Sequence, residues 1–113
     1  MVADFRSKLN FEPKQVQFID KVYNLKTDHK TGLLLQELFR READSDTDDK
    51  MLKLVLGEKQ YNELIEELEK TGEEKGSVNY TENMQAIIFG VMSVLYNKPY
   101  EDFANAVDNA EKK

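Results

Sequence analysis

An acidic run that begins at Asp44, D-S-D-T-D-D, holds carboxylates at alternate positions and resembles the start of a helix-loop-helix calcium loop. Such a loop needs a glycine at its sixth position for the sharp turn and a bidentate glutamate at its twelfth. Counted from Asp44, these positions hold Asp49 and Val55. We therefore expect a solvated acidic loop that caps the following helix, in preference to a calcium-responsive module.

The other residue types give little support for catalysis or metal binding. The chain has no cysteine, which excludes thiolate chemistry, and its single histidine, His29, lies in the polar run K-T-D-H-K. Acid–base catalysis needs carboxylates in a partly dry pocket, whereas the clustered glutamates here belong to a polar, solvated face. These glutamates are Glu63, Glu66, Glu67, Glu69, Glu73 and Glu74. The sequence predicts a protein that is not an enzyme and has no cofactor and no metal.

Length and charge restrict the class of protein further. The chain has 113 residues, 40% of them hydrophobic, which suits one folded domain. Its formal net charge of -6 repels phosphate backbones and anionic lipids, so we expect neither nucleic acid nor membrane as a partner. No apolar run is long enough to span a bilayer, and the charged first ten residues lack a signal peptide's apolar core. We expect a soluble cytoplasmic protein.

The start of the chain leaves two interpretations open. Residues 1–15 show no sustained period and contain Pro13, so we predict an arm that can pack through Phe5, Leu9 and Phe11. The segment V-Q-F-I-D-K-V-Y-N-L at residues 16–25 fits either a β-hairpin or a helix. Its β-branched and aromatic residues favour the hairpin slightly.

Helical spacing of apolar residues begins after Thr27. A first helix is capped by Thr27 or Asp28 and ends near Arg40 and Arg41. Its apolar residues recur at spacings of one, three and four: Leu34, Leu35, Leu38 and Phe39. We expect a polar loop over residues 43–49 after it.

Two further helices follow this loop. A short helix begins after Thr47 and ends at Gly57, a residue suited to a left-handed helix stop. A second helix, over residues 58–70, has a regular apolar face. The polar stretch T-G-E-E-K-G-S after it, which contains Gly72 and Gly76, predicts an exposed and mobile connection.

The last two helices contain the most informative segment. A helix over about residues 81–96 has apolar residues almost all the way round, which is typical of a central core helix or of one that shares a face with another chain. Pro99 starts a final helix to residue 107, and residues 108–113 are expected to fray. The predicted fold is mainly α: one small bundle of about four to five helices over residues 16–107.

Aromatic and methionine side chains near the end of the chain are the candidate protein-binding residues, because they suit a surface that accepts another protein's helix. They are Phe89, Met92, Tyr96, Tyr100 and Phe103. We expect most of them in the core, with the hydroxyls of Tyr96 and Tyr100 favouring a wet edge at an interface.

Three segments carry a resemblance to a known family. They are K-T-G-L-L-L-Q-E-L at 30–38, L-G-E-K-Q-Y-N-E-L at 56–64 and Y-N-K-P-Y-E-D-F at 96–103, the last one closing with Phe103. In this order, and with the apolar helix before the third, they resemble the tail assembly chaperones of phages and prophages of Gram-positive bacteria. The resemblance covers roughly residues 16–107.

The resemblance implies a non-enzymatic assembly factor in the cytoplasm of the bacterial host. Its partners would be the tape measure protein, a long helical protein that it keeps soluble, and the tail tube protein that polymerises around it. An alternative is a self-associating structural or regulatory adaptor, in which the apolar helix meets its own copy across a two-fold axis. The family offers no catalytic residues to carry over.

Overall fold

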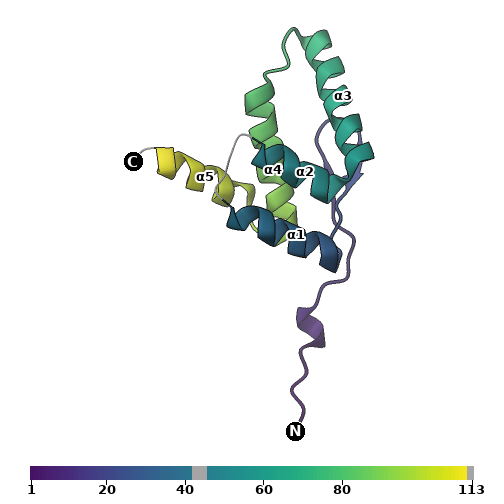
Figure 1. Ribbon diagram of the computed structural model, residues 1–113, viewed down its shortest axis with the longest axis vertical. Helices are drawn as coiled ribbons and strands as arrows, with labels where there is room; N and C mark the ends of the chain where they lie inside the picture. The colour runs from purple at the N-terminus through teal and green to yellow at the C-terminus, as the bar shows by residue number, and fades with distance from the viewer. Residues whose placement is uncertain (42–45, 112–113) are drawn as a thin grey trace.

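The computed structural model describes the backbone of residues 1–41 and 46–111, and the side chains of these residues as far as Asn105. Helices dominate it, and a short hairpin precedes them (Figure 1). The elements in chain order are the 3-10 turn η1 (Arg6–Lys8), β1 (Gln15–Gln17), β2 (Val22–Asn24), α1 (His29–Arg40), α2 (Thr47–Leu56), α3 (Glu58–Lys75), α4 (Tyr80–Tyr96) and α5 (Tyr100–Glu111). The predicted small, mainly α fold is confirmed.

The hairpin interpretation of residues 16–25 is the correct one. Strands β1 and β2 pair antiparallel, with Val16 opposite Tyr23. Both of these side chains are buried while their neighbours in each strand are exposed, because successive residues of a strand point to opposite faces. This two-residue alternation, and not the helical period, decides the local structure.

Gln60 of α3 closes the outer edge of the hairpin. The Asn24 backbone N–H donates to Gln60 Oε1 at 2.9 Å, and Gln60 Nε2 donates to the Asn24 carbonyl at 2.8 Å and to the Leu56 carbonyl at 2.7 Å. An edge strand exposes unpaired backbone groups, so this amide supplies the pairing that a third strand would provide. The L-G-E-K-Q-Y segment therefore joins the hairpin to the helices.

Helix α1 begins as predicted, with Asp28 as the cap. Asp28 accepts a hydrogen bond from the Thr31 backbone N–H at 3.2 Å and another from the Thr31 hydroxyl at 2.6 Å. The helix buries Leu35 and Leu38 but leaves Leu34 and Phe39 exposed. At about 100° per residue, Leu35 and Leu38 lie in the middle of the apolar stripe, whereas Leu34 and Phe39 lie at its two edges. His29 is exposed at the first helical position, as expected.

The joint between α2 and α3 differs in detail from the prediction. Helix α2 already includes Thr47, so the expected loop is shorter than residues 43–49. Gly57 ends α2 with a φ of 81° and a ψ of 157°, which is a positive-φ conformation outside the left-handed helical region. A glycine is still required there, but to redirect the chain straight into α3.

The loop predicted over residues 71–77 is wrong, although residues 73–77 are exposed as expected. Helix α3 continues to Lys75, and Gly72 within it is buried. A Cβ at Gly72 would lie 2.6 Å from Val78 Cγ2, so the glycine allows the next segment to pack directly on the helix. Gly76, with φ 97°, ends α3 in the left-handed region, leaving only residues 76–79 as the connection.

Helices α3 and α4 rise together from the body and meet at this connection, and α5 leaves the lower end of α4 at an angle (Figure 1). The core lies below the connection and draws on every element from β1 to α4. Its fully buried side chains are Tyr23, Met51, Leu52, Val55, Leu56, Leu64 and Val91. Helix α5 continues to Glu111, past the expected end at residue 107.

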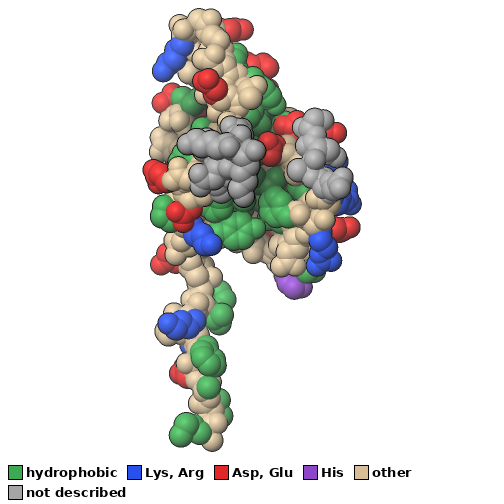
Figure 2. Space-filling view, turned by 90° about the vertical axis from the view of Figure 1, so that its left-hand side faces the viewer, with side chains coloured by type: hydrophobic (Ala, Val, Ile, Leu, Met, Phe, Trp, Pro, Cys, Tyr) green, Lys and Arg blue, Asp and Glu red, His purple; other side chains and the backbone are tan. Residues whose placement is uncertain are grey.

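The N-terminal arm runs away from the body and gives the molecule its 63 Å long axis (Figure 1). Phe5, Leu9 and Phe11 are 67%, 62% and 88% exposed, so the expected packing through them is not found. Figure 2 shows the hydrophobic side chains following one another along the arm. At the base of the arm, Lys14 Nζ donates to the Val94 carbonyl of α4 at 2.8 Å, and the Leu25 backbone N–H donates to the Lys14 carbonyl at 2.9 Å.

Candidate protein-binding surface

The five predicted binding residues lie on α4 and α5, on either side of the turn between these helices. Asn97 makes the turn with a φ of 54°, and the Lys98 backbone N–H donates to the Ser93 carbonyl at 3.1 Å. The Ser93 hydroxyl donates to the Lys98 carbonyl at 2.5 Å. These bonds fix the angle at which α5 leaves α4.

The turn brings four of the aromatic rings together in two pairs. Phe89 and Tyr100 meet edge to face, with ring centroids 5.8 Å apart, and Tyr96 and Phe103 lie 6.4 Å apart with their rings tilted by 38°. Each pair joins α4 to α5, and edge-to-face pairs stabilise such a contact beyond their area alone. We call Phe89, Tyr96, Tyr100 and Phe103 the aromatic corner.

The aromatic corner is only partly covered by the described chain. Tyr96 is 49% exposed and Tyr100 is 38% exposed, whereas Phe89 and Phe103 are half-buried. Met92, the fifth predicted residue, is also half-buried and packs against the core beside the corner. The corner is thus a rigid apolar surface that is partly exposed to water. Tyrosine is enriched at protein interfaces on surfaces of this kind.

Helix α4 is not enclosed all round by the residues that the structure describes. Its buried side chains are Met84, Ile87, Ile88 and Val91, which form one face. Val94 and Leu95 are half-buried, and Tyr96 borders a shallow hollow that Phe11 of the arm also lines. The apolar surface of the corner therefore continues toward the arm, and Figure 2 shows hydrophobic side chains gathered low on the body on this side.

No family model, curated protein or solved structure gives a significant match to this chain.

A second apolar surface, between α1 and α2, was not predicted. Leu34, Leu38 and Leu54 line it, and its edge is mostly basic. The charged residues at that edge are Glu37, Arg41, Lys50 and Lys53. The run L-L-L at residues 33–35 carries the signal for it, because three consecutive leucines on a helix cannot all be buried on one side.

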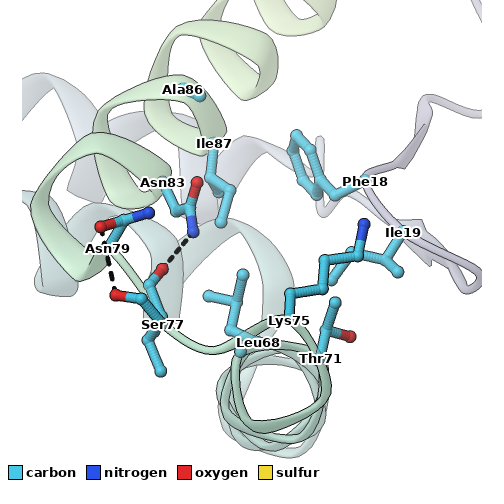
Figure 3. A pocket seen from close by; sticks show the side chains of 12 residues that line it. Phe18, Ile19, Leu68, Thr71, Lys75, Ser77, Asn79, Asn83, Ala86 and Ile87 are labelled. Atoms are coloured by element: carbon cyan, nitrogen blue, oxygen red, sulfur yellow. Dashed lines mark hydrogen bonds between the residues drawn. The ribbon is translucent and has the colours of Figure 1, made fainter.

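A cavity between the hairpin loop, α3 and α4 was also missed. Its volume is about 410 Å³. Figure 3 shows Asn83 and Ile87 of α4 on one side, Phe18, Ile19 and Lys75 on the other, and Leu68 below. We call it the wedge cavity. The glycines and polar residues around Gly72 favour a loop, so the sequence gives no sign of the close packing of Gly72 on Val78 that forms the apex of the cavity.

Among the residues 1–41 and 46–111, no cluster of three or more His, Asp or Glu side chains could hold a metal ion. The acidic run that begins at Asp44 lies partly outside these residues. The same part of the chain contains no helix long and apolar enough to cross a membrane.

One of the glutamates of α3, Glu67, hydrogen-bonds to the hairpin. Glu67 accepts a hydrogen bond from the Asp20 backbone N–H at 3.3 Å and another from the Tyr23 hydroxyl at 3.4 Å. Burial, and then the nearby Glu67 carboxylate, raises the pKa of Tyr23 to about 12. This tyrosine is a structural group, because the residue is 1% exposed and belongs to the core.

We expect this shift to make the fold sensitive to high pH. The pKa of Tyr23 is higher in the folded chain than its ordinary value of 10. The protonated hydroxyl therefore contributes its full share to the free energy of unfolding below about pH 10, and this share is lost as the pH rises to about 12. A two-unit shift corresponds to about 2.7 kcal/mol of the free energy of unfolding, of which about 2 kcal/mol is lost by pH 11.5. Urea denaturation at pH 8 and pH 11.5 measures it, and Tyr23→Phe should show a smaller fall. An equal fall in both proteins would contradict the assignment.

Proposed function

We propose that this chain is a non-enzymatic assembly chaperone of the phage tail type, which binds the helical tape measure protein and assists assembly of the tail tube. The observation that carries the proposal is the aromatic corner, a rigid apolar surface left partly open at the end of α4. The resemblance of residues 16–107 to tail assembly chaperones supports the same conclusion.

The chemistry of the corner suits a helical client. A tape measure protein exposes apolar helical stripes until the tube surrounds it, and a partner with an uncovered apolar surface can shield such stripes by accepting the helix. Tyr96 and Tyr100 provide large flat contacts with few rotatable bonds, so little side-chain entropy is lost when they are covered. The net charge of -6 keeps the chaperone itself from aggregating and disfavours nucleic acid.

A single charge at the corner is expected to disrupt client binding. Tyr96→Lys removes a half-exposed ring and places an ammonium on the apolar surface, so we expect at least a tenfold loss of co-purified tape measure protein, roughly the effect of losing an interface hot spot. The measurement is co-expression with the tape measure protein of the same genome, followed by affinity purification and quantification of both chains.

The matched control is Tyr80→Lys, the same substitution at the opposite end of α4. Tyr80 is 50% exposed, against 49% for Tyr96, so the two variants change the surface to the same degree. Tyr80→Lys should keep the client bound. If the wild-type chain neither co-purifies with the tape measure protein nor raises its solubility, the chaperone proposal fails. If both variants bind alike, the corner is not the binding surface.

The second candidate function is that of a self-associating adaptor, and the exposed arm favours it. Val2, Phe5, Leu9 and Phe11 are each more than 60% exposed, and a second copy could cover them. Sedimentation equilibrium separates the two candidates. A strict monomer at high micromolar concentration rules out the adaptor, whereas a dimer that dissociates when residues 1–11 are removed supports it.

A further inference from the structure

The wedge cavity has the dimensions of a binding site. Helices α3 and α4 meet at residues 76–79 and separate below them, and Phe18 and Ile19 of the hairpin loop close the open side (Figures 1 and 3). The volume of about 410 Å³ exceeds that of a single side chain and falls within the range of small ligand sites. Three separate elements therefore build one hollow.

The apolar part of the cavity is held in place by close packing. A Cβ at Gly90 would lie 3.0 Å from Phe18 Cε1, so the glycine lets the Phe18 ring lie directly on α4. Leu68 and Ile87 are buried and form the floor. The position of Phe18 is thus fixed by the backbone of α4, and the cavity is preformed for an apolar group.

The one charged group that lines the cavity among the described residues is positive. The polar side chains of the lining carry one ammonium, two amides and two hydroxyls, those of Lys75, Asn79, Asn83, Thr71 and Ser77. No carboxylate of the residues whose side chains are described lines the cavity, although the chain has 22 aspartates and glutamates. Within the described residues Lys75 forms no ion pair, so its ammonium is available to an incoming anion.

The first turn of α4 lies at this edge and holds one carboxylate, that of Glu82, which does not line the cavity. Asn79, the residue before α4, lines the cavity, but its side chain makes no capping hydrogen bond to the helix. The first N–H groups of a helix carry partial positive charge and remain unsatisfied without a cap. Asn79 itself accepts a hydrogen bond from the Ser77 hydroxyl at 3.2 Å, and Asn83 Nδ2 donates to the Val78 carbonyl, which orders this edge.

We propose that the wedge cavity binds an apolar side chain that has a carboxylate beside it, as an acidic amphipathic helix of the client would present. The apolar group fills the space between Phe18, Leu68 and Ile87, and the carboxylate faces the Lys75 ammonium. Only the identity of the client rests on the proposed function. The site gives the chaperone a second contact, separate from the aromatic corner, that recognises acidic segments.

A pair of small probes tests this site directly. N-acetyl-leucine carries an isobutyl group and a carboxylate, and N-acetyl-leucinamide replaces the carboxylate by a neutral amide of the same size. In ¹H–¹⁵N NMR titrations of the full chain, we expect N-acetyl-leucine to shift the backbone signals of Gly72, Val78 and Asn83. It should bind up to about fivefold more tightly than the amide, the range of a solvent-accessible ion pair.

Two lysine variants then assign the charge preference. Lys75→Gln should remove the difference between the two probes, whereas Lys70→Gln should leave it unchanged, since Lys70 lines a different hollow on the acidic face of α3. The proposal is overturned if the signals around the cavity do not shift, if the two probes bind equally, or if both variants behave alike. Because the probes are small molecules, this result is independent of whether a tape measure protein co-purifies.

Discussion

Leu64→Ala is expected to lower the free energy of unfolding by roughly 3 to 5 kcal/mol, the range for a large-to-small substitution in a rigid core. Leu64 lies in the middle of α3 with no exposed surface, within the cluster that joins the hairpin to α2, α3 and α4. A domain of this size has a total stability of about 5 to 15 kcal/mol, so the variant should lose a large part of it. Urea denaturation followed by circular dichroism measures the change.

Leu34→Ala is the matched control for this prediction. Leu34 lies on α1 and is 38% exposed, so the same substitution removes fewer buried contacts and leaves no closed cavity. We expect it to cost less than about 1 kcal/mol, in the range of ordinary surface substitutions. Equal costs for the two variants would mean that the core is not centred on α3.

Gly72→Ala is expected to destabilise the fold by about 2 kcal/mol, in spite of alanine's higher helix propensity. A Cβ at this position would lie 2.8 Å from Val78 Cα and 3.0 Å from its backbone nitrogen, so the connection to α4 has to move. Overpacking of this kind costs roughly 1 to 3 kcal/mol. Thermal and urea denaturation provide the measurement.

Gly32→Ala tests the same substitution where space is available. Gly32 is inside α1, and a Cβ there would meet nothing within 4 Å. We expect this variant to be more stable than the wild type by about 0.5 to 1 kcal/mol, because alanine loses less backbone entropy on entering a helix. The two glycines should therefore respond with opposite signs. A gain in stability with Gly72→Ala would show that Val78 is not packed on α3.

Local chemistry made much of the secondary structure predictable. Asp28 caps α1 because a side-chain oxygen beside free N–H groups needs no distant partner. Asn97 and Pro99 separate α4 from α5 for equally local reasons, a left-handed turn followed by a residue with a fixed φ. These signals depend on neighbours a few residues away, which the sequence displays directly.

The predictions failed where packing between elements overrode a local preference, or where an expected packing contact did not form. Gly72 and the polar residues around it favour a loop, but the close approach of Val78 makes a buried helical glycine the better solution. Phe5, Leu9 and Phe11 of the arm are apolar, but apolar character alone does not determine which surface covers a side chain. Within the described chain, no other element buries them. Residues 16–25 form a hairpin because Val16 and Tyr23 pair and are buried on one face, and Gln60, which lies far along the chain, closes the strand edge.

The sequence by itself determined a small acidic domain, five helices, most of their ends, and the set of aromatic residues available near the end of the chain. Only the tertiary structure decided that Phe89 meets Tyr100, that α3 and α4 enclose a cavity beside Lys75, and which leucines of α1 are exposed. Helix propensities and caps act over one turn of chain, whereas the shape of a surface depends on the angles at which whole helices pack. Those angles depend on side chains that are distant in sequence and adjacent only after folding.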